Sequence, residues 1–188
     1  MRAETLDLPR GWPHHVDKMC ELLEQFQPMH CVELGTYCGA SALATVRMLR
    51  RWGGRLTCVD TWAAGPTPTH PSMLLECVEN MQRAGVISSV SFIPATTLDV
   101  AKHWNQPLDY LYIDAGHYYE EVRDDLHAWW PHVKVGGLVC GDDYDLPGWP
   151  GVAQAWDEFE REFGQTFERF ATENTEPPGM KLVWGIKR

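Results

Sequence analysis

The chain has 188 residues, of which 44% are hydrophobic, and a formal net charge of -10 at pH 7. That length fills one core but would be cramped as two domains, so we expect one domain over residues 1–188, with residues 1–13 as an arm that could serve as a lid or a dimer contact. The acidic balance disfavours a nucleic-acid partner, because affinity for phosphate backbones comes mostly from Lys and Arg.

The sequence has neither a secretory signal nor a run of about 18 apolar residues, so we expect a cytoplasmic protein without a membrane partner. Its six cysteines are scattered, mostly inside apolar runs, and form no C-x-x-C pair. They are expected to be reduced core residues.

Apolar spacing predicts helices and strands in alternation. A helical stripe from Val16 to Phe26 ends before Pro28, and a strand begins at Cys31. The further predicted elements are a helix over 42–49, a strand over 56–60, a loop over 61–72, a helix over 74–81 closed by Gly85, a strand over 90–93, a short helix over 97–104, a strand over 110–114, a helix over 122–130 stopped by Pro131, a strand over 137–140, a helix over 152–163 closed by Gly164, and closing strands over 166–170 and 180–186. This order predicts an α/β fold with a parallel sheet covered on both faces.

The first strand runs into a glycine turn, Glu33-Leu34-Gly35-Thr36-Tyr37-Cys38-Gly39-Ala40-Ser41. Glycine permits a sharp turn and close approach of a ligand, and the first amides of the next helix point into such a turn. The G-x-x-x-G spacing differs from the G-x-G-x-x-G of dinucleotide sites, which weakens an NAD interpretation. Many strand-to-helix turns use two glycines only to reverse the chain, so the turn alone does not decide the ligand.

Acidic residues stand at the carboxyl ends of several predicted strands, where α/β folds bind ligands. They are Glu33, Asp60, Asp114, Asp142 and Asp143. Any one of them could be a helix cap or a turn former. Together they would repel one another without cations, which favours a metal and a ligand with hydroxyls or a positive charge.

The glycine turn resembles motif I of catechol O-methyltransferase and its class I S-adenosylmethionine-dependent relatives. The stretch from Ile113-Asp114-Ala115-Gly116-His117 through Trp130-Pro131 and Gly136-Gly137 to Gly141-Asp142-Asp143-Tyr144 is similar to small bacterial methyltransferases related to macrocin and other sugar O-methyltransferases. The resemblance covers about residues 30 to 165. It implies a Rossmann-like class I methyltransferase fold, with a mostly parallel seven-stranded sheet, helices on both faces and an antiparallel C-terminal strand pair.

The same resemblance assigns residues to a cofactor, S-adenosyl-L-methionine. It implies that Asp60 accepts hydrogen bonds from the ribose hydroxyls, and a carboxylate at the end of the second strand suits a ribose diol. The other cofactor contacts that it implies are Glu33, Gly35, Thr36, Tyr37 and Ser41 in the turn, Thr61, Ala95 and Thr96 at later strand ends, and Asp114.

The resemblance also places Asp114, Asp142 and Asp143 around a divalent cation, foremost Mg²⁺, a hard ion that prefers carboxylate oxygens, with Mn²⁺ or Ca²⁺ as substitutes. His117 is the candidate base, because the base of catechol O-methyltransferase also stands three residues after the first metal aspartate. Some bacterial relatives have an acid where this chain has Gly116, so a mechanism using that acid is excluded.

Three functions remain open. The first is a metal-dependent O-methyltransferase acting on a small molecule with adjacent oxygens, such as a sugar, a natural product or a catechol; the second is an idle S-adenosylmethionine-binding module; the third is an NAD-type oxidoreductase. Trp12, Trp62 and Trp149 lie in Pro- and Gly-rich segments and are candidates to touch the substrate, whereas the other tryptophans are expected in the core.

Overall fold

The computed structural model describes residues 8–9, 15–63, 71–172 and 181–188. Within these residues seven strands form one sheet in the order β3-β2-β1-β4-β5-β7-β6. The strands are β1 (His30–Leu34), β2 (Arg55–Asp60), β3 (Val90–Pro94), β4 (Leu108–Ile113), β5 (Val133–Tyr144), β6 (Phe167–Ala171) and β7 (Lys181–Lys187). Strands β1 to β5 pair in parallel, and β7 runs antiparallel to both β5 and β6. The predicted fold class, including the antiparallel C-terminal strands, is confirmed.

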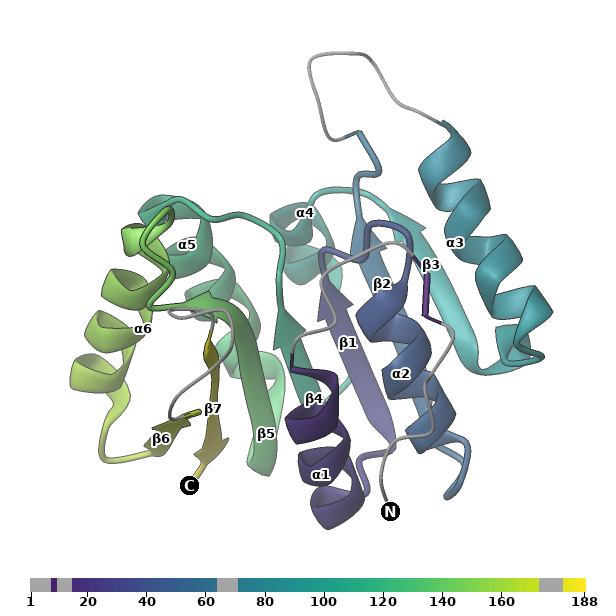
Figure 1. Cartoon of the computed structure of the whole chain (residues 1–188). Helices are drawn as coiled ribbons and strands as arrows, with labels where there is room; N and C mark the ends of the chain where they lie inside the picture. The colour runs from purple at the N-terminus through teal and green to yellow at the C-terminus, as the bar shows by residue number, and fades with distance from the viewer. Residues whose placement is uncertain (1–7, 10–14, 64–70, 173–180) are drawn as a thin grey trace.

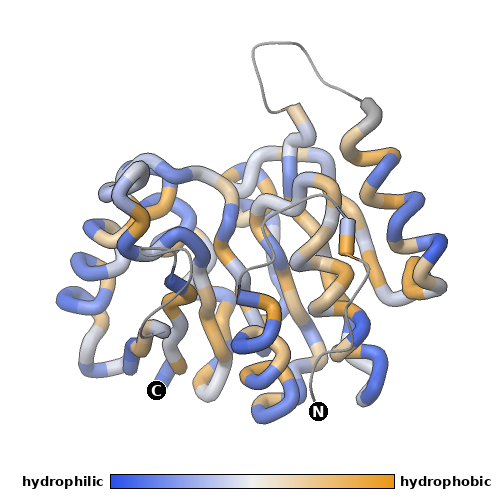
Figure 2. Tube along the Cα trace, in the orientation of Figure 1, coloured by the Kyte–Doolittle hydropathy of each residue, from blue (hydrophilic) through white to orange (hydrophobic). Residues whose placement is uncertain are grey.

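Six α-helices of the described chain cover the two faces of the sheet (Figure 1). They are α1 (Val16–Phe26), α2 (Ala40–Leu49), α3 (Pro71–Arg83), α4 (Thr97–His103), α5 (Tyr119–Trp129) and α6 (Pro150–Phe163), with two short 3₁₀ helices, η1 (Ile87–Ser89) and η2 (Trp130–His132). Hydrophobic and hydrophilic residues alternate along the helices (Figure 2), and the buried hydrophobic residues of the helices pack with those of the strands.

The sheet separates two hydrophobic cores. Strand residues contribute to them alternately: in β4, Tyr110 and Tyr112 pack with helices α1 to α3, whereas Leu111 and Ile113 pack with α4 to α6. This is the period of two that a strand buried on both faces requires.

The cores differ in composition. The α4–α6 core is rich in aromatic side chains, with Trp129, Trp156 and Phe159 fully or almost fully buried. All six cysteines lie in or against the α1–α3 core, and none of them is in a disulfide: Cys20, Cys31, Cys38, Cys58, Cys77 and Cys140. The expectation of reduced core cysteines is confirmed.

Several element boundaries differ from the predicted ones by one to three residues, and both ends of β5 differ by four. Helix α3 begins at Pro71, inside the predicted loop over 61–72, and residues 64–70 of that loop lie outside the described part of the chain. Strand β5 begins four residues earlier than predicted and continues through Asp142 and Asp143, so both acids extend the strand. Residues 1–7 and 10–13 of the predicted arm are likewise not described. No helix in the described ranges is long and apolar enough to cross a membrane.

Candidate active site

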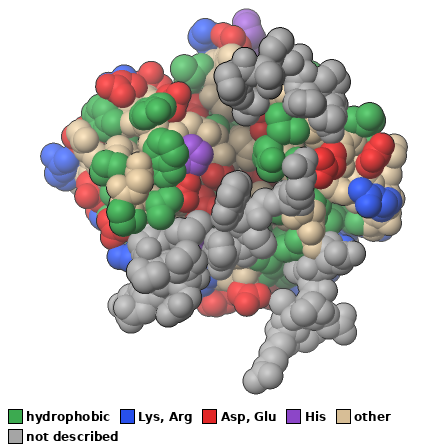
Figure 3. Space-filling view, turned by 45° about the horizontal axis from the view of Figure 1, so that its top comes forward, with side chains coloured by type: hydrophobic (Ala, Val, Ile, Leu, Met, Phe, Trp, Pro, Cys, Tyr) green, Lys and Arg blue, Asp and Glu red, His purple; other side chains and the backbone are tan. Residues whose placement is uncertain are grey.

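A pocket of about 830 Å³ lies at the carboxyl ends of β1, β2, β3, β4 and β5. Twelve of the thirteen predicted site residues line it: Gly35, Thr36, Tyr37, Ser41, Asp60, Thr61, Ala95, Thr96, Asp114, His117, Asp142 and Asp143. Glu33 does not. Figure 3 shows acidic side chains and a histidine near the centre of this side of the molecule, with hydrophobic side chains to one side. Residues from five separate strand ends therefore meet as the parallel topology requires.

Gly35 and Gly39 have positive φ angles of 80° and 89°, which favour glycine. A Cβ at Gly35 would overlap the backbone carbonyl of Asp114, and one at Gly39 would lie 2.7 Å from Cys77 Sγ. The two glycines thus let β1 approach β4 and let α2 approach α3. The positive φ angles support the predicted sharp turn, and the atoms that a Cβ would meet at both glycines belong to the protein; that the glycines also let a ligand approach remains a prediction.

Asp60 holds the glycine turn in place. Its Oδ2 accepts hydrogen bonds from the backbone N–H groups of Thr36 (2.8 Å) and Tyr37 (2.9 Å), and its Oδ1 accepts one from Trp62 N–H (2.6 Å). The indole Nε1 of Trp62 donates to Tyr37 O at 2.9 Å. Trp62 is only 3% exposed and does not line the pocket, so its prediction as a substrate contact is wrong: it supports the turn from behind.

Glu33 does not line the pocket but is hydrogen-bonded to Ser41, which does. Its side chain is fully buried, and its Oε1 accepts a 2.7 Å hydrogen bond from the hydroxyl of Ser41, which does line the pocket. Its Oε2 has no hydrogen-bond partner among the residues that the structure describes. Burial raises the pKa of Glu33 to about 8. Because the Ser41 proton points to Glu33, the lone pairs of Ser41 are free to accept a hydrogen bond from a ligand.

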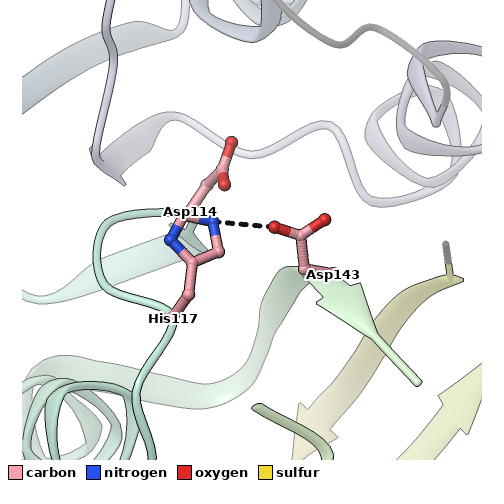
Figure 4. A group of neighbouring side chains, drawn as sticks. All are labelled: Asp114, His117 and Asp143. Atoms are coloured by element: carbon pink, nitrogen blue, oxygen red, sulfur yellow. Dashed lines mark ion pairs between the residues drawn. The ribbon is translucent and has the colours of Figure 1, made fainter. Parts of the chain in front are cut away.

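Asp114, His117 and Asp143 form one compact group, with one possible ligand atom from each lying within 4.8 Å of the others (Figure 4). His117 Nε2 is 2.7 Å from Asp143 Oδ2, and this hydrogen bond raises the pKa of His117. Burial and then the neighbouring carboxylates of Asp142 and Asp143 raise the pKa of Asp114. Asp143 has a φ of 56°, a left-handed conformation that is uncommon outside glycine and occurs at functional sites.

Asp142 lines the pocket, but both of its oxygens have protein partners. Oδ1 accepts the N–H of Asp143 at 2.8 Å and lies 3.1 Å from His15 Nε2, while Oδ2 accepts the hydroxyl of Tyr112 at 3.2 Å. His15 precedes α1 and is only 6% exposed. Sequence reasoning gave this histidine no role, because nothing local shows that the start of α1 meets the end of β5. The assignment of Asp142 to a metal remains a prediction.

Sequence reasoning also missed Glu121, on the first turn of α5. Its Oε2 accepts the N–H groups of His117 (3.1 Å) and Tyr118 (3.2 Å), forming a capping box that fixes the segment carrying His117. A Cβ at Gly116 would lie 2.8 Å from Glu121 Cδ, so the glycine makes room for this carboxyl group. The tyrosine at the N-cap concealed the usual Ser/Thr-x-x-Glu signal.

A turn between β5 and α6 forms the apolar side of the pocket. Leu146 N–H donates to Asp143 O at 3.1 Å and Trp149 N–H to Leu146 O at 2.9 Å, and both side chains line the pocket. The Trp149 ring lies 5.0 Å from the His117 ring and 5.8 Å from the Tyr118 ring, between centroids. Trp149 thus stands where the sequence predicted a substrate contact, and Trp12 lies outside the described residues.

The pocket fits a cationic ligand better than an anionic one. Five carboxylates line it, those of Asp60, Asp114, Glu121, Asp142 and Asp143, and its described lining contains no Lys or Arg. The turn amides that would bind a phosphate already donate to Asp60. The compact group of Asp114, His117 and Asp143 offers oxygen and nitrogen ligands to a divalent cation.

Comparison with known proteins gives one family and several structures. Residues 32–144 match the family described as methyltransferase domain. Demethylmacrocin O-methyltransferase from Streptomyces fradiae is 42% identical over 45 residues, which are 24% of this chain and only 11% of that enzyme. An O-methyltransferase from Bacillus cereus in complex with SAH superposes with a TM-score of 0.76 at 17% identity, covering 97% of this chain and 85% of that one. The O-methyltransferase TomG from Streptomyces achromogenes, in complex with SAM, gives 0.72 at 18%, covering 97% and 82%.

Proposed function

This chain belongs to the methyltransferase domain family, and on that premise we propose that it transfers the methyl group of S-adenosylmethionine to a hydroxyl of a small molecule with two adjacent oxygens, with a divalent cation at the acidic end of the pocket. The family match and the fold confirm the resemblance to class I methyltransferases noted in the sequence.

The charge of the pocket is the observation that supports this cofactor best. S-Adenosylmethionine carries a sulfonium and an ammonium group, and a pocket lined by five carboxylates without described Lys or Arg favours both. The free lone pairs of Ser41 suit the ammonium. Asp60 Oδ1, which accepts only the N–H of Trp62, can accept a further hydrogen bond from a ribose hydroxyl while Oδ2 holds the turn.

The same observation disfavours the NAD-type oxidoreductase. A dinucleotide places its pyrophosphate on free amides at the start of the helix. Here the amides of Thr36 and Tyr37 donate to Asp60, whose negative charge would also repel the phosphates. Calorimetry should therefore detect binding of S-adenosylmethionine and S-adenosylhomocysteine, and none of NAD. Binding of NAD alone would overturn the assignment.

At the acidic end, Asp114 and Asp143 would hold the cation, with Asp142 as the third predicted ligand. When bound, the ion would lower the pKa of the acceptor hydroxyl and fix its oxygen in line with the methyl group. His117 would remove the hydroxyl proton at Nε2, the atom that now faces Asp143. Glu121 would keep the histidine in position through the backbone of residues 117 and 118.

Turnover tests the enzyme against the idle module. A methyl acceptor screened with and without chelator should be methylated only when Mg²⁺ is present, and Asp143→Asn should weaken metal binding while S-adenosylmethionine binding persists. If no vicinal diol, sugar or catechol is methylated with metal and cofactor both bound, the idle module is the better description.

His117 can serve as the base or as a ligand of the ion, and one variant separates these roles. As the base, His117→Ala should lower kcat by about 10²- to 10⁴-fold with unchanged Mn²⁺ affinity. A large loss of Mn²⁺ affinity would make His117 a ligand, and a fall in kcat below about threefold would remove it from the catalytic group.

A further inference from the structure

We infer, on the basis of the proposed methyl transfer, that the acceptor is a ring-bearing diol that is uncharged or cationic around its reacting oxygens, without a carboxylate or phosphate there. The inference depends on which charges surround the acceptor end of the pocket and on the apolar turn that lies against it.

The acceptor end carries an excess of negative charge. Its carboxylates are those of Asp114, Glu121, Asp142 and Asp143. His117 is the only basic side chain among the described lining residues, and it is already hydrogen-bonded to Asp143. Four carboxylates exceed the two charges of a divalent ion at this end, while the cofactor's charge is matched by Asp60 at the other end of the pocket. Transfer of the acceptor's hydroxyl proton to His117 leaves the net charge of this end unchanged, so a further anionic group on the acceptor would still meet the excess of carboxylates and be repelled.

The apolar side of this end is supplied by the turn between β5 and α6. Backbone hydrogen bonds from Leu146 to Asp143 and from Trp149 to Leu146 tie this turn directly to an acid of the proposed metal site. Trp149 is held by ring contacts with His117 and Tyr118, so its indole is fixed next to the proposed base. A flat or saturated ring can pack on indole while two of its oxygens face the acids.

The excess of carboxylates and the apolar turn together distinguish between classes of acceptor. Neutral and amine-bearing rings with vicinal hydroxyls satisfy both the indole and the acids. Sugar acids, phosphorylated sugars and coenzyme A thioesters bring anionic groups for which the described lining offers no free cation. A hydroxylated amine would gain from the carboxylates that the ion and the cofactor leave uncompensated.

Two matched acceptor series test the charge preference with the metal-loaded protein. The first is dopamine, 4-methylcatechol and 3,4-dihydroxyphenylacetate, and the second is glucosamine, glucose and glucuronate. In whichever series is methylated, the carboxylate member should have a kcat/KM at least about tenfold below the neutral member. Equal or faster turnover of the carboxylate overturns the inference but leaves the methyl transfer standing. No turnover in either series, with cofactor and metal bound, refutes both.

A charge placed on the turn gives a second, independent measurement. Leu146→Lys should lower the ratio of kcat/KM for the neutral acceptor to kcat/KM for the carboxylate acceptor at least about threefold. The matched uncharged variant Leu146→Gln should leave this ratio unchanged. Trp149→Ala should raise the KM for the acceptor at least about tenfold while the affinity for S-adenosylmethionine stays unchanged. Trp149→Phe should bring the acceptor KM most of the way back to the wild-type value. A KM unaffected by Trp149→Ala would remove the ring from the inference.

Discussion

Replacing the buried Glu33 by Gln should change how the stability of the protein depends on pH. Burial raises the pKa of this carboxyl group in the folded protein from its ordinary value of 4.5 to about 8. Between these values the folded chain keeps a proton that the unfolded chain releases, so the folded state binds more protons and stability falls as pH rises. At 1.36 kcal/mol per pKa unit, the loss is roughly 5 kcal/mol across that window and is complete above pH 8.

Glu33→Gln cannot titrate and can still accept the Ser41 hydrogen bond. The variant should therefore gain stability relative to wild type by roughly 3 to 4 kcal/mol between pH 5 and pH 8. Urea unfolding of the cofactor-free protein at several pH values measures the difference, and the exposed Glu120→Gln supplies the baseline. A difference that stays flat from pH 5 to pH 8 would refute the reasoning, because Glu33 would then be ionised in the folded protein.

Three further outcomes follow from the glycine turn. Gly35→Ala should lower the free energy of unfolding by at least about 3 kcal/mol, because a Cβ at this position meets the backbone of Asp114. Gly53→Ala is the control, since Gly53 has a φ of 87° but open space around it, and this variant should lose only about 1 to 2 kcal/mol. Equal losses in urea unfolding would rule out the clash. Calorimetry should show that S-adenosylmethionine binds more tightly as pH rises from 6 to 8, because a cationic ligand favours ionised Glu33. Glu33→Gln should abolish this pH dependence of the affinity. If the pH dependence persists in the variant, another group causes it. Trp62→Phe, which removes the hydrogen bond to Tyr37, should weaken cofactor binding about three- to tenfold by the same method, and unchanged affinity would show that the turn does not need it.

Periodicity and strand-end chemistry were enough to predict the parallel sheet and the acids at its carboxyl edge, whereas the other pocket residues were predicted from the resemblance to class I methyltransferases. Buried strands alternate with amphipathic helices over short distances in the sequence, and parallel strands bring their carboxyl ends to one edge whatever the loop details. For that reason Asp60, Asp114 and Asp143 meet as predicted. The proximity of these acids could therefore be predicted without knowing the geometry of their side chains.

The remaining features depend on contacts between segments far apart in the sequence. His15 meets Asp142 only because α1 packs beside the end of β5, and no local pattern encodes that distance. No local pattern predicts the clash at Gly35 either, because its crowding atom belongs to Asp114, which follows β4 and lies 79 residues further along the chain. Glu121 was missed because a tyrosine occupies the N-cap of α5, where the usual signature has a hydroxyl residue.

The placement of every cysteine on one side of the sheet makes the thiols a built-in reporter. Buried thiols react with labelling reagents only when their surroundings open, and those of the α1–α3 core include Cys38 within the glycine turn. Pulsed alkylation followed by mass spectrometry would therefore time the opening of that layer and of the turn, while the aromatic layer beneath α4–α6 contributes no signal. The alkylation rates of Cys38 and of Cys31, at the opposite end of the sheet, can then be compared with and without ligand. If the ligand slows alkylation at Cys38 but not at Cys31, its stabilising effect is confined to the pocket end of this layer, and no engineered label is needed.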